Sequence, residues 1–124
     1  MKKVMLIDDD ESMFYLIRML LRNSYEVDCY NNALDALLQA RGNEYDLMLM
    51  DINFGGGMNG IDLFREIRKL EIHKNTAIIA ITAFAMMGDR EEFLEIGFNE
   101  YLSKPFNKTQ LLNTIEKTNS VKIL

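Results

Sequence analysis

VMLIDDD, at residues 4–10, is an apolar run of strand length that stops at three consecutive aspartates. Similar short apolar runs follow at residues 27–30, 47–50, 78–81 and 101–102. They are mostly continuous rather than alternating, which is typical of parallel strands whose two faces are both covered by helices. Between the runs lie segments whose apolar residues recur at helical spacing. The pattern therefore predicts five strands and five helices in strict alternation.

Five apolar stripes define the predicted helices. The stripes consist of Met13, Ile17, Leu20 and Leu21; of Leu34, Leu37 and Leu38; of Leu63, Phe64, Ile67 and Leu70; of Phe93, Leu94 and Ile96; and of Leu111, Leu112 and Ile115. Asn32 and Asn59 precede two of these stripes as N-cap residues would. Asn107 and Gln110 have the spacing of a capping box, and Gly97 follows the fourth stripe as a C-terminal glycine would. This alternation predicts an α/β fold with right-handed crossovers, in which ligands bind at the carboxyl ends of the strands.

The composition fits a single globular domain, which we expect to span residues 1–124. A net charge of −5 argues against nucleic-acid binding and against binding to anionic lipid by this chain alone. One cysteine, Cys29, and one histidine, His73, exclude an internal disulfide, a thiolate cluster and a His-rich metal site. A reducing, cytoplasmic setting fits this cysteine usage best. The run at residues 4–7 is too short for a signal peptide, and we find no segment able to insert into a membrane.

Acidic residues follow the first and third predicted strands. Asp8, Asp9 and Asp10 come after the first, and Asp51 comes after the third. Neighbouring first and third strands in a doubly wound sheet would bring these carboxylates to one edge, where they repel unless a cation or protons compensate. Because the ligands are oxygens, Mg²⁺ is the favoured ion. The alternative is loop solvation and favourable charge at a helix N-terminus, which we prefer for Asp10 and Glu11.

The fourth and fifth predicted strands end in a hydroxyl and an ammonium group. Thr82 follows the fourth strand, and Lys104, next to the only proline, Pro105, follows the fifth. Taken alone, Thr82 would be interpreted as a cap or turn residue, and Lys104 as a solvated charge. Chance would rarely place acids, a hydroxyl and an ammonium at the same edge of a sheet, so together they indicate a site.

The sequence resembles the receiver domain of two-component response regulators over nearly its whole length. The matching stretches are VMLIDDD at 4–10, YDLMLMDIN at 45–53, NGIDLFREIR at 59–68, AIIAITAFAMMGDREEFLEIGFNEYLSKPF at 77–106 and NKTQLL at 107–112. The resemblance implies a flavodoxin-like (βα)5 fold, with a doubly wound parallel five-stranded sheet of strand order 2-1-3-4-5 and helices on both faces. It also implies a signalling domain rather than an enzyme, one that assists its own phosphorylation and dephosphorylation.

The resemblance also assigns roles to the residues at the strand ends. Asp51 matches the phosphoacceptor, which binds the metal together with Asp8 and Asp9, Asp9 being favoured as a direct ligand. The backbone carbonyl of Asn53 would complete the protein's share of the Mg²⁺ coordination. Thr82 and Lys104 match the positions that contact the phosphoryl group, and Tyr101 matches the aromatic switch residue.

These roles are chemically reasonable. Asp51 is a weak nucleophile toward an anionic donor, so Mg²⁺ and Lys104 are needed to neutralise charge on the group in transfer. Thr82 can donate a hydrogen bond to the phosphoryl oxygens, and this contact would pull its loop inward. Asn53 and Phe84 occupy the two variable positions that govern hydrolysis in this family. Phe84 offers no acceptor to orient a water, so we expect a long-lived phosphorylated form.

The loop after Asp51 departs from the family pattern. It is one residue longer than usual and lacks the family's proline, and its run of Gly55, Gly56 and Gly57 does not match a nucleotide-binding motif. We therefore interpret it as a flexible loop.

Two further expectations follow from the family: a cis Lys104–Pro105 bond and an output surface formed by the fourth helix, fifth strand and fifth helix. Met86, Met87, Tyr101 and Phe106 would lie near the active-site end of that surface.

The predicted function is a phosphorylation-controlled switch. The donor is a phosphohistidine on a sensor histidine kinase or a phosphotransfer protein, which would dock on the first helix near Met13, Phe14 and Ile17. The output is contact with a downstream protein that the sequence does not identify, and the chain is either a stand-alone regulator or a domain of a larger protein. Two alternatives stay open: a haloacid-dehalogenase-like phosphatase, although residues 6–12 do not match its DxDx[TV] motif, and a phosphorylation-independent receiver scaffold.

Overall fold

In the part of the chain that the structure describes, five strands and five α-helices alternate, as expected. The computed structural model describes residues 1–54 and 57–123, with side chains described as far as residue 119. The strands are β1 (Lys2–Ile7), β2 (Tyr25–Tyr30), β3 (Leu47–Asp51), β4 (Ala77–Thr82) and β5 (Glu100–Ser103). The helices are α1 (Ser12–Leu21), α2 (Ala33–Gly42), α3 (Gly60–Arg68), α4 (Asp89–Ile96) and α5 (Lys108–Ile123), with a short 3₁₀ helix, η1 (Glu71–His73), before β4.

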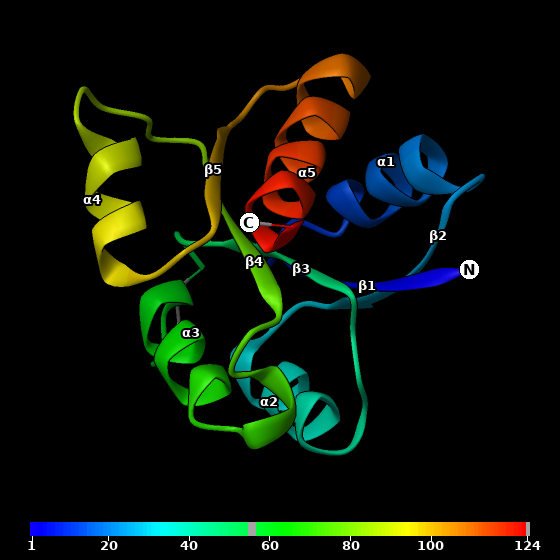
Figure 1. The fold of residues 1–124 in the computed structure, drawn as a ribbon, viewed down its shortest axis with the longest axis vertical. Coiled ribbons are helices and arrows are strands. Elements are labelled where there is room, and N and C mark those ends of the chain that lie inside the picture. The colour runs from blue at the N-terminus through cyan, green and yellow to red at the C-terminus, as the bar shows by residue number, and fades with distance from the viewer. Residues whose placement is uncertain (55–56, 124) are drawn as a thin grey trace.

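The strands form one parallel sheet between two layers of helices. Their order is β2-β1-β3-β4-β5, which confirms the flavodoxin-like topology. Helices α1 and α5 cover one face, α2 and α3 cover the other, and α4 lies beside β5 at the edge (Figure 1). Every residue of β3 and β4 is buried, as the continuous apolar runs predict for central parallel strands. Within the described residues, no helix is long and apolar enough to cross a membrane.

The stripe predicted for the second helix is partly wrong. Leu34 and Leu38 are 66% and 52% exposed. The buried residues of α2 are instead Ala33, Ala36, Leu37 and Ala40. Small alanines let this helix approach the sheet closely, so the two large leucines fall on the outer face. Helix α4 also differs from an ordinary amphipathic helix, since none of its residues is fully buried.

The predicted helix ends are confirmed. The Asn32 side chain accepts a hydrogen bond from Asp35 N–H, and Asn59 forms a reciprocal capping box with Asp62. Asn107 and Gln110 form the reciprocal pair of side-chain to backbone bonds that their spacing predicts. Gly97 ends α4 with φ at 125°, a conformation that side-chain-bearing residues rarely adopt. The three asparagine caps fix where the loops at the carboxyl edge of the sheet end, and Gly97 begins the turn that leads into β5 at the opposite edge.

Candidate functional site

The side chains that the sequence singled out converge at the carboxyl edge of the sheet. Asp8 directly follows β1, Asp51 ends β3, Thr82 ends β4, and Lys104 directly follows β5. The first three are buried, with exposed fractions of 0%, 4% and 3%. This edge is the expected ligand side of a doubly wound sheet, and β1 and β3 are direct neighbours there.

Three carboxylates form the centre of the site. One oxygen each from Asp8, Asp9 and Asp51 can be chosen so that all three lie within 4.8 Å of one another. Asp51 Oδ1 accepts a hydrogen bond from Asn53 N–H at 3.0 Å, and Asp8 Oδ1 accepts one from Asp10 N–H at 2.9 Å. These bonds orient the two buried carboxylates, whereas Asp9 is exposed. An all-oxygen set with one solvent-facing member fits Mg²⁺, which retains water ligands.

Glycine lets the chain pass close behind Asp51. A Cβ atom at Gly60 would lie 2.5 Å from the backbone oxygen of Asp51 and 2.7 Å from the Cα of Ile52. Any larger residue would push the start of α3 away from the end of β3. Gly60 therefore helps to fix the position of the Asp51 backbone.

Lys104 bridges two of the acids. Its Nζ lies 2.7 Å from Asp8 Oδ2 and 3.8 Å from Asp51 Oδ2. The peptide bond between Lys104 and Pro105 is cis, which confirms the prediction. Burial raises the pKa of Asp8, and this effect outweighs the hydrogen bond from Lys104, which lowers it. Burial acts to lower the pKa of Lys104, but the hydrogen bond and charge of Asp8, together with the charges of Asp51 and Asp10, outweigh it, so the net change is upward. The ammonium thus stays charged and offsets part of the carboxylate repulsion.

Thr82 lies in a short hydrogen-bond chain beside the acids. Its hydroxyl donates to Asn53 Oδ1 at 2.5 Å, and its oxygen accepts from Phe84 N–H at 3.1 Å. The bond between Asn53 and Thr82 was not predicted, because nothing in the sequence shows which way the asparagine side chain points. The Phe84 ring is 72% exposed, so in this structure it faces solvent.

Asp10 lies at the start of α1, where we preferred a role in favourable charge at a helix N-terminus over metal binding. Its Oδ1 accepts from both the backbone N–H and the hydroxyl of Ser12 at the start of α1. The hydrogen bond from the Ser12 hydroxyl is the largest of the effects that lower the pKa of Asp10. Asp10 therefore belongs to the helix start, as that interpretation had it.

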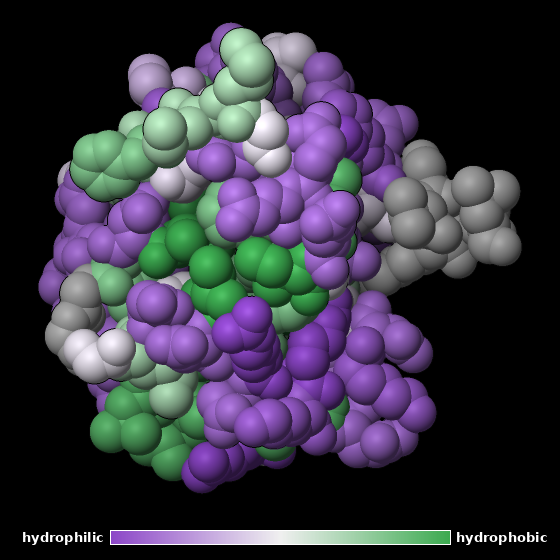
Figure 2. All heavy atoms as spheres, turned by 90° about the vertical axis from the view of Figure 1, so that its left-hand side faces the viewer, coloured by the Kyte–Doolittle hydropathy of each residue, from purple (hydrophilic) through white to green (hydrophobic). Residues whose placement is uncertain are grey.

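Tyr101 lies on β5 against α4. Its ring stacks on Phe93 with centroids 5.5 Å apart, and its hydroxyl oxygen is buried without a hydrogen-bond partner. Burial raises the pKa of Tyr101, and the charge of Asp89 adds to the effect. In the loop before α4, Met86 and Met87 are 75% and 104% exposed. Figure 2 shows the side of the molecule that carries α4, where weakly hydrophobic, pale green atoms run along the upper left and strongly hydrophobic, deep green atoms gather in the middle between hydrophilic ones.

The expected docking residues on the first helix need correction. Met13 and Ile17 are 8% and 0% exposed, because they belong to the stripe that packs α1 onto the sheet. Tyr15 and Met19 lie on the outer face, with exposed fractions of 86% and 55%, and line a shallow surface hollow together with Arg18 and Arg22. A partner on α1 would meet this outer face rather than Met13 and Ile17.

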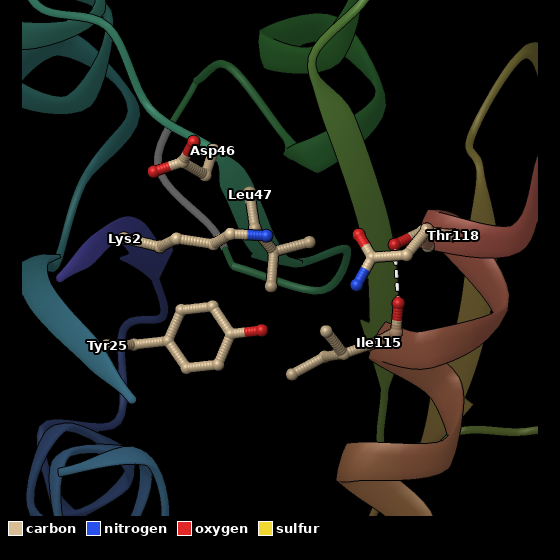
Figure 3. Close-up of a pocket in the computed structure, with 7 residues that line it drawn as sticks. Lys2, Tyr25, Asp46, Leu47, Ile115 and Thr118 are labelled. Atoms are coloured by element: carbon tan, nitrogen blue, oxygen red, sulfur yellow. Dashed lines mark hydrogen bonds between the residues drawn. The ribbon is translucent and has the colours of Figure 1, made fainter. Parts of the chain in front are cut away.

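One cavity lies at the opposite edge of the sheet from the acids. It has a volume of about 100 Å³ and is lined by Lys2, Tyr25, Asp46, Leu47, Ile115, Thr118 and Asn119 (Figure 3). Lys2 and Leu47 begin the strands β1 and β3, at whose far ends Asp8 and Asp51 lie. The cavity is therefore separate from the acidic cluster.

The predicted glycine loop cannot be compared in full, since Gly55 and Gly56 lie outside the described residues.

Comparisons with known proteins agree with this geometry. Residues 4–116 match the model of the response regulator receiver domain. The chain is 35% identical over 116 residues to the polar-differentiation response regulator DivK of Brucella anthropi, which covers 93% of this chain and 94% of the relative.

Solved structures show the same fold. Chemotaxis protein CheY4 of Vibrio cholerae superposes with a TM-score of 0.86 at 28% identity, covering 95% of this chain and 98% of that one. The receiver domain of sensor histidine kinase PA1611 of Pseudomonas aeruginosa, described with a magnesium ion in its active-site cleft, gives 0.84 at 32% identity over 96% and 98% of the two chains. The match over most of the chain, together with the sheet order and the acidic edge, shows that this chain belongs to the response regulator receiver domain family of two-component signalling proteins.

Proposed function

We propose that Asp51 accepts a phosphoryl group in a reaction that requires Mg²⁺. The observation that carries this proposal is the clustering of three carboxylates within 4.8 Å, with the Lys104 ammonium 2.7 Å from Asp8 and 3.8 Å from Asp51. Asp51 is the member of the cluster that ends the central strand β3, and its Oδ2 atom faces the ammonium. An attacking carboxylate and an anionic donor need this kind of charge compensation.

The residues around Asp51 divide the work. Asp8, Asp9, Asp51 and the Asn53 backbone carbonyl would hold Mg²⁺, which supplies charge neutralisation on the phosphoryl group. The Lys104 ammonium would neutralise further negative charge on the same phosphoryl group. Carboxylate oxygens and a carbonyl fit this ion, and the burial of Asp8 favours occupancy because a cation offsets the cost of burying its charge.

The phosphoryl group would then act as the signal. Thr82 would donate a hydrogen bond from its hydroxyl to a phosphoryl oxygen, and Phe84 would follow because its N–H donates to the same hydroxyl oxygen. This movement would bring the Phe84 ring from its exposed position toward Asp51, where it can restrict access of the water needed for hydrolysis. Asn53, by contrast, can hydrogen-bond such a water and would permit hydrolysis. Tyr101, on the neighbouring strand, would respond by changing its packing against α4 and would alter the surface formed by α4, β5 and α5.

The proposed donor is a phosphohistidine on a sensor histidine kinase or a phosphotransfer protein in the cytoplasm. The proposed output is contact with a downstream protein, with no direct nucleic-acid binding and no membrane insertion. The domain supplies groups for its own phosphorylation and dephosphorylation without acting on a separate substrate. Membership of the receiver family does not favour the phosphatase alternative, and the completeness of the acidic cluster argues against a phosphorylation-independent scaffold.

The test is incubation with acetyl phosphate, followed by intact mass spectrometry. We expect one added phosphoryl group in the presence of Mg²⁺, almost none with EDTA and none in Asp51→Asn. Asp62→Asn is the matched control, because this acid caps α3 and lies outside the cluster. A modification that persists in Asp51→Asn, or that forms at full rate under EDTA, would sink the assignment.

A further inference from the structure

The Asn53 side chain already accepts the hydrogen bond that the Thr82 hydroxyl would have to donate in the proposed switch. The Thr82 hydroxyl donates to Asn53 Oδ1 at 2.5 Å while its oxygen accepts from Phe84 N–H at 3.1 Å. A hydroxyl has a single proton, so Thr82 cannot donate to Asn53 and to another acceptor at full strength. Thr82 is 3% exposed, which leaves little access for water to replace either partner.

From this geometry we infer that Asn53 is a positioning residue that holds Thr82 in the resting state. Its side-chain oxygen competes with the phosphoryl group for the hydrogen bond that the Thr82 hydroxyl donates. The inference rests on the proposed function, in which Thr82 contacts a phosphoryl group on Asp51. Each active molecule must break the bond between Asn53 and Thr82 before the new one forms. Asn53 therefore sets how readily the domain switches, in addition to any effect on hydrolysis.

The backbone around Asn53 is held independently of its side chain. Ile52 N–H donates to the Ile81 carbonyl at 2.9 Å, and Asn53 N–H donates to Asp51 Oδ1 at 3.0 Å. Ile52 and Phe54, on either side, are buried, whereas Asn53 is exposed. Shortening the Asn53 side chain should thus remove the bond to Thr82 and leave the carbonyl, the proposed Mg²⁺ ligand, in place.

The loop before α4 is connected to the same hydroxyl. Because Phe84 N–H binds Thr82 Oγ1, the bond from Thr82 to Asn53 also fixes the first residues of this loop. Release of Thr82 frees the loop to move with the hydroxyl. Asn53 thereby connects the loop after β3 to the loop after β4, across the two central strands of the sheet.

The experiment measures the affinity of the phosphoryl mimic beryllofluoride in Mg²⁺ by NMR titration. Asn53→Ala should bind about 2- to 12-fold more tightly than the parent, because its resting state lacks one ordinary hydrogen bond that the bound state does not use. Asn113→Ala, an exposed asparagine on α5, is the matched control and should bind as the parent does.

A double-mutant cycle separates this role from a general effect on the site. In a Thr82→Val background, Asn53→Ala should no longer change the affinity, whereas in Thr82→Ser, which keeps the hydroxyl, the increase should remain. Weaker or unchanged binding by Asn53→Ala, or an increase that persists in Thr82→Val, overturns the inference while the proposed function stands. A parent protein that does not bind beryllofluoride in Mg²⁺ at all overturns the proposed function and the inference with it.

Discussion

Replacing Lys104 with methionine removes the ammonium from the acidic cluster and keeps much of the side-chain volume. The ammonium lies 2.7 Å from Asp8, whose carboxylate is fully buried. Asp8 would retain the hydrogen bond from Asp10 N–H but would lose its cationic partner. The substitution therefore leaves a buried carboxylate that is compensated only in part.

The expected cost can be bounded. Removing one partner of a buried ion pair costs about 3–5 kcal/mol, and protonation of the remaining acid gives an escape that reduces the cost. We therefore expect Lys104→Met to lower the free energy of unfolding by about 2–3 kcal/mol at neutral pH without Mg²⁺. With a denaturant slope of about 1–3 kcal/mol per M, the urea midpoint would fall by about 0.7–3 M.

The pH dependence of this cost has a defined sign. Burial raises the pKa of Asp8 above that of an ordinary aspartate, and loss of the Lys104 hydrogen bond would raise it further. A carboxyl whose pKa is raised in the folded state loses stabilisation as the pH rises through that pKa. The difference between Lys104→Met and the parent should thus be largest at neutral pH and should shrink as the pH falls toward the unfolded value. Mg²⁺ should also narrow it, because a bound cation would replace the missing charge.

The assay is urea unfolding followed by circular dichroism, at several pH values and with or without Mg²⁺. Lys74→Met is the control, since Lys74 pairs with an exposed glutamate on the surface and should cost less than about 1 kcal/mol. An equal loss of stability at all pH values, or a loss no greater than that of Lys74→Met, would refute the reasoning about Asp8.

Phe84→Ala and Phe84→Glu should both lose phosphate faster than the parent in Mg²⁺, because each removes the apolar ring that we expect to restrict water; equal decay of all three proteins would exclude Phe84 from this role. Beryllofluoride should shift the NMR signals of Tyr101 as well as those of the acidic cluster, and shifts confined to the cluster would contradict the proposed switch. Arg90→Met should lower the free energy of unfolding by about 1–2 kcal/mol, because the guanidinium binds both oxygens of the buried Glu100 carboxylate. Amide hydrogen exchange should rise in α4 of that variant, and unchanged exchange there would show that the ion pair does not hold the helix.

The sheet and the site were predictable from the sequence for a common physical reason. Parallel strands that are buried on both faces must be continuously apolar, so each polar residue that ends such a run marks the carboxyl edge. Asp8, Asp51, Thr82 and Lys104 all stand at those positions, and the structure places them together. The cap residues were equally local signals, since Asn59 and its partner three residues later act within one helical turn.

The features that escaped prediction depend on contacts between distant segments. Leu34 and Leu38 have the spacing of a core stripe, yet α2 packs through alanines, whose small size gives a weaker pattern. The bidentate pair of Arg90 and Glu100 and the bond from Thr82 to Asn53 join residues of different elements. Nothing in the spacing of these residues identifies the partner of each one.

The central claim is that Asp51 is the residue that becomes phosphorylated. The direct measurement is to phosphorylate the protein with acetyl phosphate in Mg²⁺, reduce the acyl phosphate with borohydride to the alcohol, and locate the reduced residue by peptide mass spectrometry. The account predicts reduction at Asp51 alone, dependent on Mg²⁺. Reduction at Asp8 or Asp9, or no reduced residue in protein that has taken up phosphate, would contradict it.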